Sequence, residues 1–358
     1  MENVTIDSNH GKEKIIINTP GGGSNDANDA RSSLSKLLRW LLTGIGVSVF
    51  LYLIYRMGWQ NILDNILHFG AWFIVILMIQ MVWVVLQATS WYMIQNSLFQ
   101  RAHLLFFIRN KIISDTMNTV LPMANLGGDA MRAYLIKPRI PLKEGVAGIV
   151  VDKTIESIAG SLFLACGVLI TILFFPISQA IMIPAVACFL ALVIVITLLI
   201  LFQLRGFYRS AMDLFNWIPA VSRLLEKKKE ILGILDENMR LLYQRGRVNI
   251  PLSIWLHFMA RIIGVFEVLI VLWVLHHPMG FFGSWFISAA VTIANTILFI
   301  VPGHWGVQEG MYALVFKTMY FSASVGLSLA IIRRIRRIFL LGLGLMLFNL
   351  KKEKQVDA

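Results

Sequence analysis

The sequence predicts an all-α polytopic membrane protein with about six transmembrane helices and two re-entrant hairpins in an inverted repeat. Two observations lead to this prediction. Hydrophobic residues make up 57% of the 358 residues and the mean hydropathy is +0.72, as in proteins with many membrane spans. Two glycine-rich, charged stretches interrupt the apolar pattern, and charge or broken backbone at membrane depth is costly enough to indicate function.

The two interrupting stretches resemble each other in order and spacing. Both contain an Asn-Thr dipeptide before a proline, and Asp129 follows Pro122 by seven residues, just as Glu309 follows Pro302. Weak internal symmetry of this kind is typical of transporters that are built from repeats.

Each stretch is followed by a pair of like charges. Asp152 and Glu156 follow the first, and Arg333 and Arg337 follow the second. Because the members of each pair are four residues apart, each pair lies on one face of a helix. The first repeat is therefore predicted to present an acidic face and the second a basic one.

The chain is predicted to divide into a tail, a membrane domain and a second tail. Residues 1–33 are polar and predict a disordered segment without a signal-peptide core. The membrane domain is expected over 34–350, with a cytoplasmic amphipathic helical insertion at 205–250. A basic cytoplasmic tail follows at 351–358. The net charge of +12 suits contact with anionic headgroups, and its scatter among apolar spans argues against nucleic acid.

The first half is predicted to hold spans at 37–55, 71–94 and 146–175. Basic residues before the first span favour a cytoplasmic N-terminus. Trp72 and Trp91 are expected to anchor the second span at its two membrane interfaces.

The first hairpin is predicted between the second and third spans. It consists of a helix at 103–121, a turn from Pro122 to Gly128, where proline and glycine end the helix, and a partial helix at 130–136. The alternative is an amphipathic helix on the cytoplasmic surface.

The second half is predicted to repeat this plan. Spans are expected at 181–204, 251–276 and 324–348, and a hairpin at 282–320 turns at 303–306. Six crossings leave both termini in the cytoplasm, and the hairpins then enter from opposite sides, as alternating access around a midplane site requires.

The basic pair has an alternative placement. If 311–332 is the last span, Arg333 to Arg337 is a positive-inside cytoplasmic run and 338–350 a short interfacial helix.

The charged residues predict a site for an anionic lipid headgroup. Glycines let backbone approach a phosphate, a helix N-terminus favours an anion, and guanidinium groups pair with phosphate bidentately. The acidic residues could hold those arginines, bind a cationic headgroup or carry a coupling proton. In the alternative, Asp152 and Glu156 only neutralise Arg132 or Lys153. The predicted substrate-binding residues are Asn118, Pro122, Gly127, Gly128, Asp129, Arg132, Asp152, Glu156, Pro302, Gly303, Gly306, Glu309, Arg333 and Arg337.

Cysteine and histidine spacing predicts no metal, cofactor or disulfide site. Cys166 and Cys188 fall inside apolar segments, and His276, His277 and His304 lack ligand spacing.

The motifs resemble those of the membrane domain of lysylphosphatidylglycerol synthase. They are LP-x-x-x-LGGDA-x-R from Leu121 to Arg132, DK-x-x-E from Asp152 to Glu156, and PGHWGVQEG at 302–310. Similar domains also occur alone as flippase-like proteins, including ones linked to hopanoid synthesis and lipid-linked glycan pathways. The resemblance covers roughly residues 36–350 and implies lipid translocation. The soluble synthase domain is expected to be absent, because the chain ends eight residues later.

The predicted function is therefore that of a non-enzymatic flippase. It moves an anionic phospholipid or polyprenyl-phosphate-type lipid between the leaflets of a bacterial-type inner membrane. Its expected partners are membrane lipids, with a second copy of the chain or lipid and glycan biosynthesis enzymes left open. The alternatives are a membrane lipid-modifying transferase that uses Asp129, Asp152 and Glu156, and a non-transporting partner that recruits a biosynthetic complex through residues 205–247.

Overall fold

The chain divides into two compact units, Met1–Val49 and Phe50–Ala358. The computed structural model describes residues 5–7, 14–16, 69–98, 102–120, 126–174, 229–244, 249–297, 307–318 and 323–350, together with isolated positions elsewhere.

The described part of the first unit is a pair of short strands. Strand β1 (Thr5–Asp7) pairs antiparallel with β2 (Lys14–Ile16), and Ile6 lies opposite Ile15. Both strands fall in the segment whose composition predicts a disordered tail. A two-stranded ribbon of this length is at most marginally stable in water by itself.

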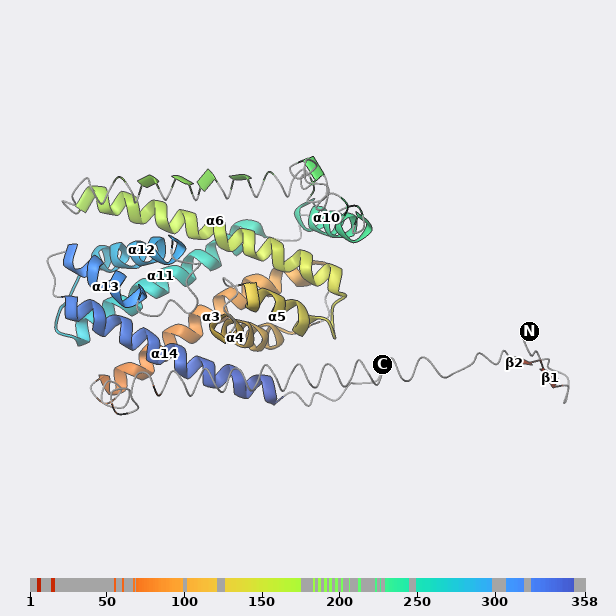
Figure 1. Ribbon diagram of the computed structural model, residues 1–358, viewed down its shortest axis with the longest axis horizontal. Coiled ribbons are helices and arrows are strands. Elements are labelled where there is room, and N and C mark those ends of the chain that lie inside the picture. Colours follow the sequence, from red (N-terminus) through yellow and green to blue (C-terminus); the bar gives the residue numbers. More distant parts are fainter. Residues whose placement is uncertain are drawn as a thin grey trace. The chain divides into compact units, whose positions relative to one another are not determined.

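The described part of the second unit is entirely helical (Figure 1). Three of its helices are long and apolar enough to cross a membrane, α3, α6 and α11, which confirms the predicted second, third and fifth spans. The predicted first span lies almost wholly outside the described residues, and of the predicted fourth span the structure describes separate helical positions but no continuous helix. The helices are α3 (Ala71–Leu98), α4 (Leu104–Val120), α5 (Leu126–Ile136), α6 (Leu142–Phe174), α10 (Lys229–Gln244), α11 (Ile250–Val274), α12 (Phe281–Ile297), α13 (Val307–Thr318) and α14 (Ala323–Asn349).

Local sequence explains where the fifth predicted span begins. The Asn249 side chain accepts a hydrogen bond from the backbone N–H of Leu252 at 3.0 Å and so caps the first turn of α11. Pro251 follows within that turn, where its missing N–H leaves no intrahelical bond unmade.

Helices α4 and α5 correspond to the two arms of the predicted first hairpin and pack against each other, and residues 121–125 between them lie outside the described residues. The Gly128 N–H donates to Asn118 Oδ1 at 2.6 Å, and Ser114 Oγ donates to the Gly128 carbonyl at 2.9 Å. The prediction that Gly127 and Gly128 form the turn is wrong, because both lie in the first turn of α5. Glycine is needed at 128 because a Cβ there would overlap the Asn118 amide.

Helices α12 and α13 form the corresponding part of the second half. Each contacts the other, and α13 packs along α14. The predicted turn at 303–306 lies outside the described residues. Helix α14 continues without a break through Arg333 to Arg337, so the alternative in which 338–350 is a separate interfacial helix is wrong.

The packing repeats between the two halves (Figure 1). In α3–α6 and again in α11–α14, the first helix contacts the second and fourth, and the third contacts the second and fourth. Across the halves, α3 packs against α11, α4 against α14, and α12 against α6. This reciprocal pattern agrees with the internal repeat predicted from the two motifs. Six crossings and hairpins that re-enter the membrane stay predictions.

Close approach and apolar packing hold the halves together. Gly344 of α14 faces Thr116 of α4 so closely that a Cβ would overlap the threonine hydroxyl, as small residues permit between membrane helices. Buried residues of α3, α11, α12, α13 and α14 share one apolar core. Helix α10, which packs against α6 and α3, confirms a helix in the predicted insertion.

Substitution Gly128→Ala is expected to lower the melting temperature of the purified protein in detergent, followed by tryptophan fluorescence. The added methyl group collides with Asn118, and overpacking of this kind costs about 1–3 kcal/mol. Gly233→Ala in α10 is the matched control, because nothing lies within 4 Å of a Cβ there. The control should leave the melting temperature unchanged or raise it, and equal melting temperatures for the two variants would contradict the proposed fit.

Candidate functional site

Two groups of charged side chains are buried between the helices of the second unit. We call the first the aspartate group and the second the arginine group. The aspartate group comprises Ser90, Asp129, Arg132, Asp152 and His257; the arginine group comprises Glu267, Tyr312, Arg333 and Arg336.

The carboxylate of Asp152 joins four helices. Its Oδ2 accepts from Arg132 of α5 at 2.9 Å. Its Oδ1 accepts from Ser90 of α3 at 3.3 Å and lies 3.1 Å from His257 Nε2 of α11. Asp152 is completely buried, and a buried charge is tolerated only when it is paired and hydrogen-bonded in this way.

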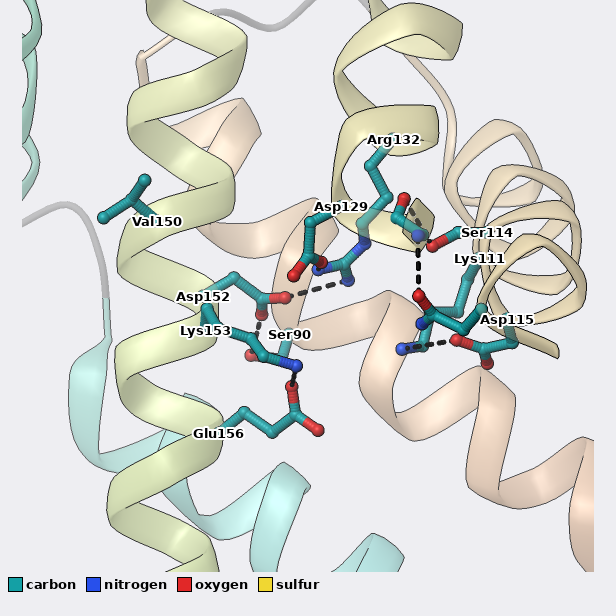
Figure 2. Close-up of polar contacts among 12 residues, drawn as sticks. Ser90, Lys111, Ser114, Asp115, Asp129, Arg132, Val150, Asp152, Lys153 and Glu156 are labelled. Atoms are coloured by element: carbon teal, nitrogen blue, oxygen red, sulfur yellow. Dashed lines mark hydrogen bonds and ion pairs between the residues drawn. The ribbon is translucent and has the colours of Figure 1, made fainter. Parts of the chain in front are cut away.

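The Arg132 guanidinium lies between two carboxylates, as Figure 2 shows: Asp152 at 2.9 Å and Asp129 at 3.6 Å. It also lies over the ring of Trp91, 4.3 Å from the centroid. Trp91 is fully buried, so the prediction that it anchors a membrane interface is wrong. Its indole face instead supports a buried cation.

Glu156 pairs with Lys153 one turn earlier on α6, at 3.0 Å (Figure 2). Together with the Arg132–Asp152 pair, this contact matches the alternative in which Asp152 and Glu156 neutralise nearby cations. The predicted acidic face is therefore occupied by Arg132 and Lys153 of the first half, together with His257 of the second.

The arginine group is built on Glu267 of α11. Its Oε2 lies 2.5 Å from Arg336 NH1 and 3.5 Å from Arg333 NH2. Arg333 also donates to the Tyr312 hydroxyl of α13 and, at 3.3 Å, to the Gly264 carbonyl. These contacts place the predicted basic face of α14 against α11 and α13.

A cavity of about 320 Å³ opens beside the arginine group. Asp115 and Glu267 lie on its wall, and Asp115 is itself held by Lys111 at 3.1 Å. Three guanidinium groups therefore face a cavity with two carboxylates, one of which already has a lysine partner. The lining comes from α3, α4, α11 and α14, and its polar and charged members are Gln80, Asp115, Thr116, Thr119, Glu267, Arg333, Arg336 and Arg337.

The two groups occupy equivalent places in the two halves. Asp152 lies ten residues after the start of α6, and Arg333 ten residues after the start of α14. Each receives a partner from α11, which supplies His257 to the first group and Glu267 to the second. Neither of these α11 residues was selected from the sequence, although an ionisable residue inside a span is itself a functional signal.

The remaining predicted site residues fall into three groups. Asn118 and Gly128 form the contact between α4 and α5, and Gly127 lies in the first turn of α5. Glu309 lies on α13, and the structure does not describe its side chain. Pro122, Pro302, Gly303 and Gly306 lie outside the described residues.

The described residues offer no group of three or more His, Cys, Asp or Glu side chains arranged to hold a metal ion. Cys166 packs among the apolar residues shared by α6, α11 and α12. The chemistry that the arrangement offers is anion binding, because the arginines of α14 present guanidinium groups to a cavity.

A family model, described as the lysylphosphatidylglycerol synthase TM region, matches residues 39–344. The match includes both helical hairpins and all residues of the aspartate and arginine groups. No curated protein and no solved structure matches the chain.

Substitution Asp152→Asn is expected to destabilise the protein by about 3–5 kcal/mol, the usual cost of removing one partner of a buried pair. The measurement is thermal or denaturant unfolding in detergent. Adding Arg132→Gln to Asp152→Asn should recover part of the loss, since the buried guanidinium is then gone. Lys153→Gln is the control: its side chain is 47% exposed, so the change should cost about 1 kcal/mol or less. Equal losses in Asp152→Asn and Lys153→Gln would contradict the assignment.

Proposed function

Since the chain belongs to the family of the lysylphosphatidylglycerol synthase TM region, we propose that it is a lipid translocase. It moves an anionic lipid, a phospholipid or a polyprenyl-phosphate-type lipid, from one leaflet of the membrane to the other. The observation that carries the proposal is the arginine-lined cavity among the helices of an integral membrane protein.

The positive charge of the cavity supports an anionic headgroup as its ligand. Arg333 and Arg336 share one oxygen of Glu267, so in the described part of the chain two cations face a single counter-ion. Their Nε atoms have no hydrogen-bond partner among the described residues. A phosphate group offers several acceptor oxygens to such donors, and guanidinium binds it more strongly than a neutral donor does.

The size of the cavity supports entry of the headgroup alone. About 320 Å³ is at the small end of the range for ligand pockets. Apolar residues of α3 and α14, among them Val84 and Leu341, share the lining with the arginines. The acyl or prenyl chains would remain in the surrounding lipid while the headgroup crosses.

The reciprocal packing of the two halves suits alternating access. Repeat-built transporters move one half against the other around a site near the midplane. Here the cavity lies where α3 and α4 of one half meet α11 and α14 of the other. Movement at that boundary would open the cavity to either leaflet. We place the protein in a bacterial-type inner membrane, with both termini in the cytoplasm.

The rival function of a lipid-modifying transferase has no observation in its favour. Two of its three candidate acids, Asp129 and Asp152, share the Arg132 guanidinium, and Glu156 pairs with Lys153. A recruiting function through α10 likewise rests only on the amphipathic character of that helix.

Neutralising the arginines of the cavity is expected to slow translocation. In liposomes that contain the purified protein and fluorescent phosphatidylglycerol, the double variant Arg333→Gln/Arg336→Gln should reduce the dithionite-accessible exchange rate at least tenfold. The reason is that each hydrogen bond to a charged group contributes about 1.5–3 kcal/mol.

Arg334→Gln is the matched control for this experiment. Arg334 is on the same helix and carries the same charge, but it does not line the cavity. Its rate should stay within about twofold of wild type, by the small effect usual for substitutions away from a site. An undiminished rate in the double variant would remove the arginines from the mechanism.

The headgroup selectivity of translocation provides a separate test. Wild-type protein should translocate fluorescent phosphatidylglycerol faster than phosphatidylcholine, whose choline brings a second, positive charge toward the arginines. The ratio of the two rates should fall toward one in Arg333→Gln/Arg336→Gln. Equal wild-type rates for the two lipids would show that the charge of the cavity does not select the headgroup.

A further inference from the structure

Glu267 is the acidic residue most closely engaged with the arginines of the cavity. Its side chain is only 2% exposed, although the residue lines the cavity wall. Both Arg333 and Arg336 reach the same oxygen, Oε2, whereas Oε1 is buried and has no hydrogen-bond partner among the described residues. The carboxylate therefore uses one of its two oxygens for two guanidinium groups.

This pairing is incomplete on both sides. A guanidinium and a carboxylate make their strongest contact when two N–H groups meet two oxygens. Here Arg333 Nε and Arg336 Nε are also buried without a partner among the described residues. Buried polar atoms that stay unpaired are unfavourable, so this arrangement is one that a better acceptor can replace.

A phosphate group is such an acceptor. Its tetrahedral oxygens can give each arginine an acceptor of its own, whereas in this structure both arginines reach the same oxygen of the Glu267 carboxylate. The phosphate and the carboxylate cannot share the same donors, because two anions a few ångströms apart in a buried site repel each other strongly. Binding of one therefore requires withdrawal or neutralisation of the other.

We propose that Glu267 is an internal competitor for the anionic ligand: its carboxylate holds Arg333 and Arg336 until a phosphate group displaces it, and its return releases that group. The inference rests on the proposed function for the identity of the site and adds the residue that sets affinity and release. The shared ligand chemistry is a phosphate group, carried either by a lipid or by free phosphate.

If Glu267 competes with the ligand, one substitution should change binding and translocation in opposite directions. Glu267→Gln keeps the size of the side chain and removes its negative charge. Phosphate binding should then tighten by about tenfold or more, since a nearby like charge is gone. Translocation should slow rather than quicken, because nothing then drives the phosphate off the arginines.

The test is isothermal titration of the full chain in detergent, with two probes in separate arms. One arm uses dihexanoyl phosphatidic acid and the other inorganic phosphate. Glu267→Gln should tighten binding of at least one probe by about tenfold. Tightening for dihexanoyl phosphatidic acid identifies a lipid-borne phosphate as the ligand, and tightening for inorganic phosphate identifies free phosphate. Unchanged or weaker binding of both probes by Glu267→Gln overturns the proposal.

Two matched controls separate competition from a general change of charge. Glu267→Asp retains the negative charge and should not tighten binding. Asp213→Asn makes an equivalent acid-to-amide change at an exposed position and should leave both affinities as in wild type. Tightening in Asp213→Asn equal to that in Glu267→Gln overturns the proposal.

A further variant keeps the test decisive if Glu267→Gln alone folds poorly. Glu267→Gln/Arg336→Gln removes the competitor together with one of its two arginines, so the combined charge of Glu267, Arg333 and Arg336 stays as in wild type. Its phosphate affinity should return to within about threefold of wild type, whereas Arg336→Gln alone should bind more weakly than the double variant. Identical affinities for Arg336→Gln with and without Glu267→Gln overturn the proposal.

The competition by Glu267 and the proposed translocase function can be refuted independently of each other. Tighter phosphate binding by Glu267→Gln in a protein that moves no lipid supports the competition and removes the proposed function. Translocation that depends on Arg333 and Arg336, combined with unchanged binding in Glu267→Gln, supports the proposed function and overturns the competition.

Discussion

Burial of charged side chains between apolar helices is the constraint on which the rest of this structure depends. In such surroundings an unpaired charge is so unfavourable that each buried cation must meet an anion. Arg132 meets Asp152 and thereby ties α5 to α6, and Arg336 meets Glu267 and ties α14 to α11. The helices are apolar along most of their length, and apolar contacts alone would permit many registers. The ion pairs select one of them.

Each half contains a buried charged group, but the two groups differ in how completely their charges are paired. At equivalent positions of the repeat, α6 carries Asp152 and α14 carries Arg333. In the first group the Arg132 guanidinium has two carboxylates and an aromatic face, and Arg132 is 1% exposed. Among the described residues, the second group has two arginines on one glutamate, and it faces a cavity. The second group is therefore the one for which we propose ligand binding.

Much of the architecture could be predicted from the sequence because hydropathy is local. The long apolar runs specify α3, α6 and α11, and the glycine-rich stretches mark the two helical hairpins. Local patterns were less reliable where a residue's role depends on a distant neighbour. Gly127 and Gly128 were predicted to form a turn, yet they begin α5, because Asn118 of the preceding helix accepts the Gly128 N–H. Trp91 is of a residue type that often anchors a helix at the membrane interface, yet here Arg132 covers its ring.

The sequence by itself determined that this chain is an integral membrane protein of the lysylphosphatidylglycerol synthase TM-region family. It also determined which helices are apolar enough to cross a membrane and that charged pairs interrupt the apolar pattern. These properties follow from composition and spacing along the chain. Only the tertiary structure decided which charges meet. The acidic pair of α6 lies beside Arg132 and Lys153 of its own half and His257 of the other. Glu267, 66 residues before Arg333, holds Arg333 and Arg336 of α14. The physical reason is that ion pairs depend on distance in space, which helix packing sets and which spacing in the chain does not reveal.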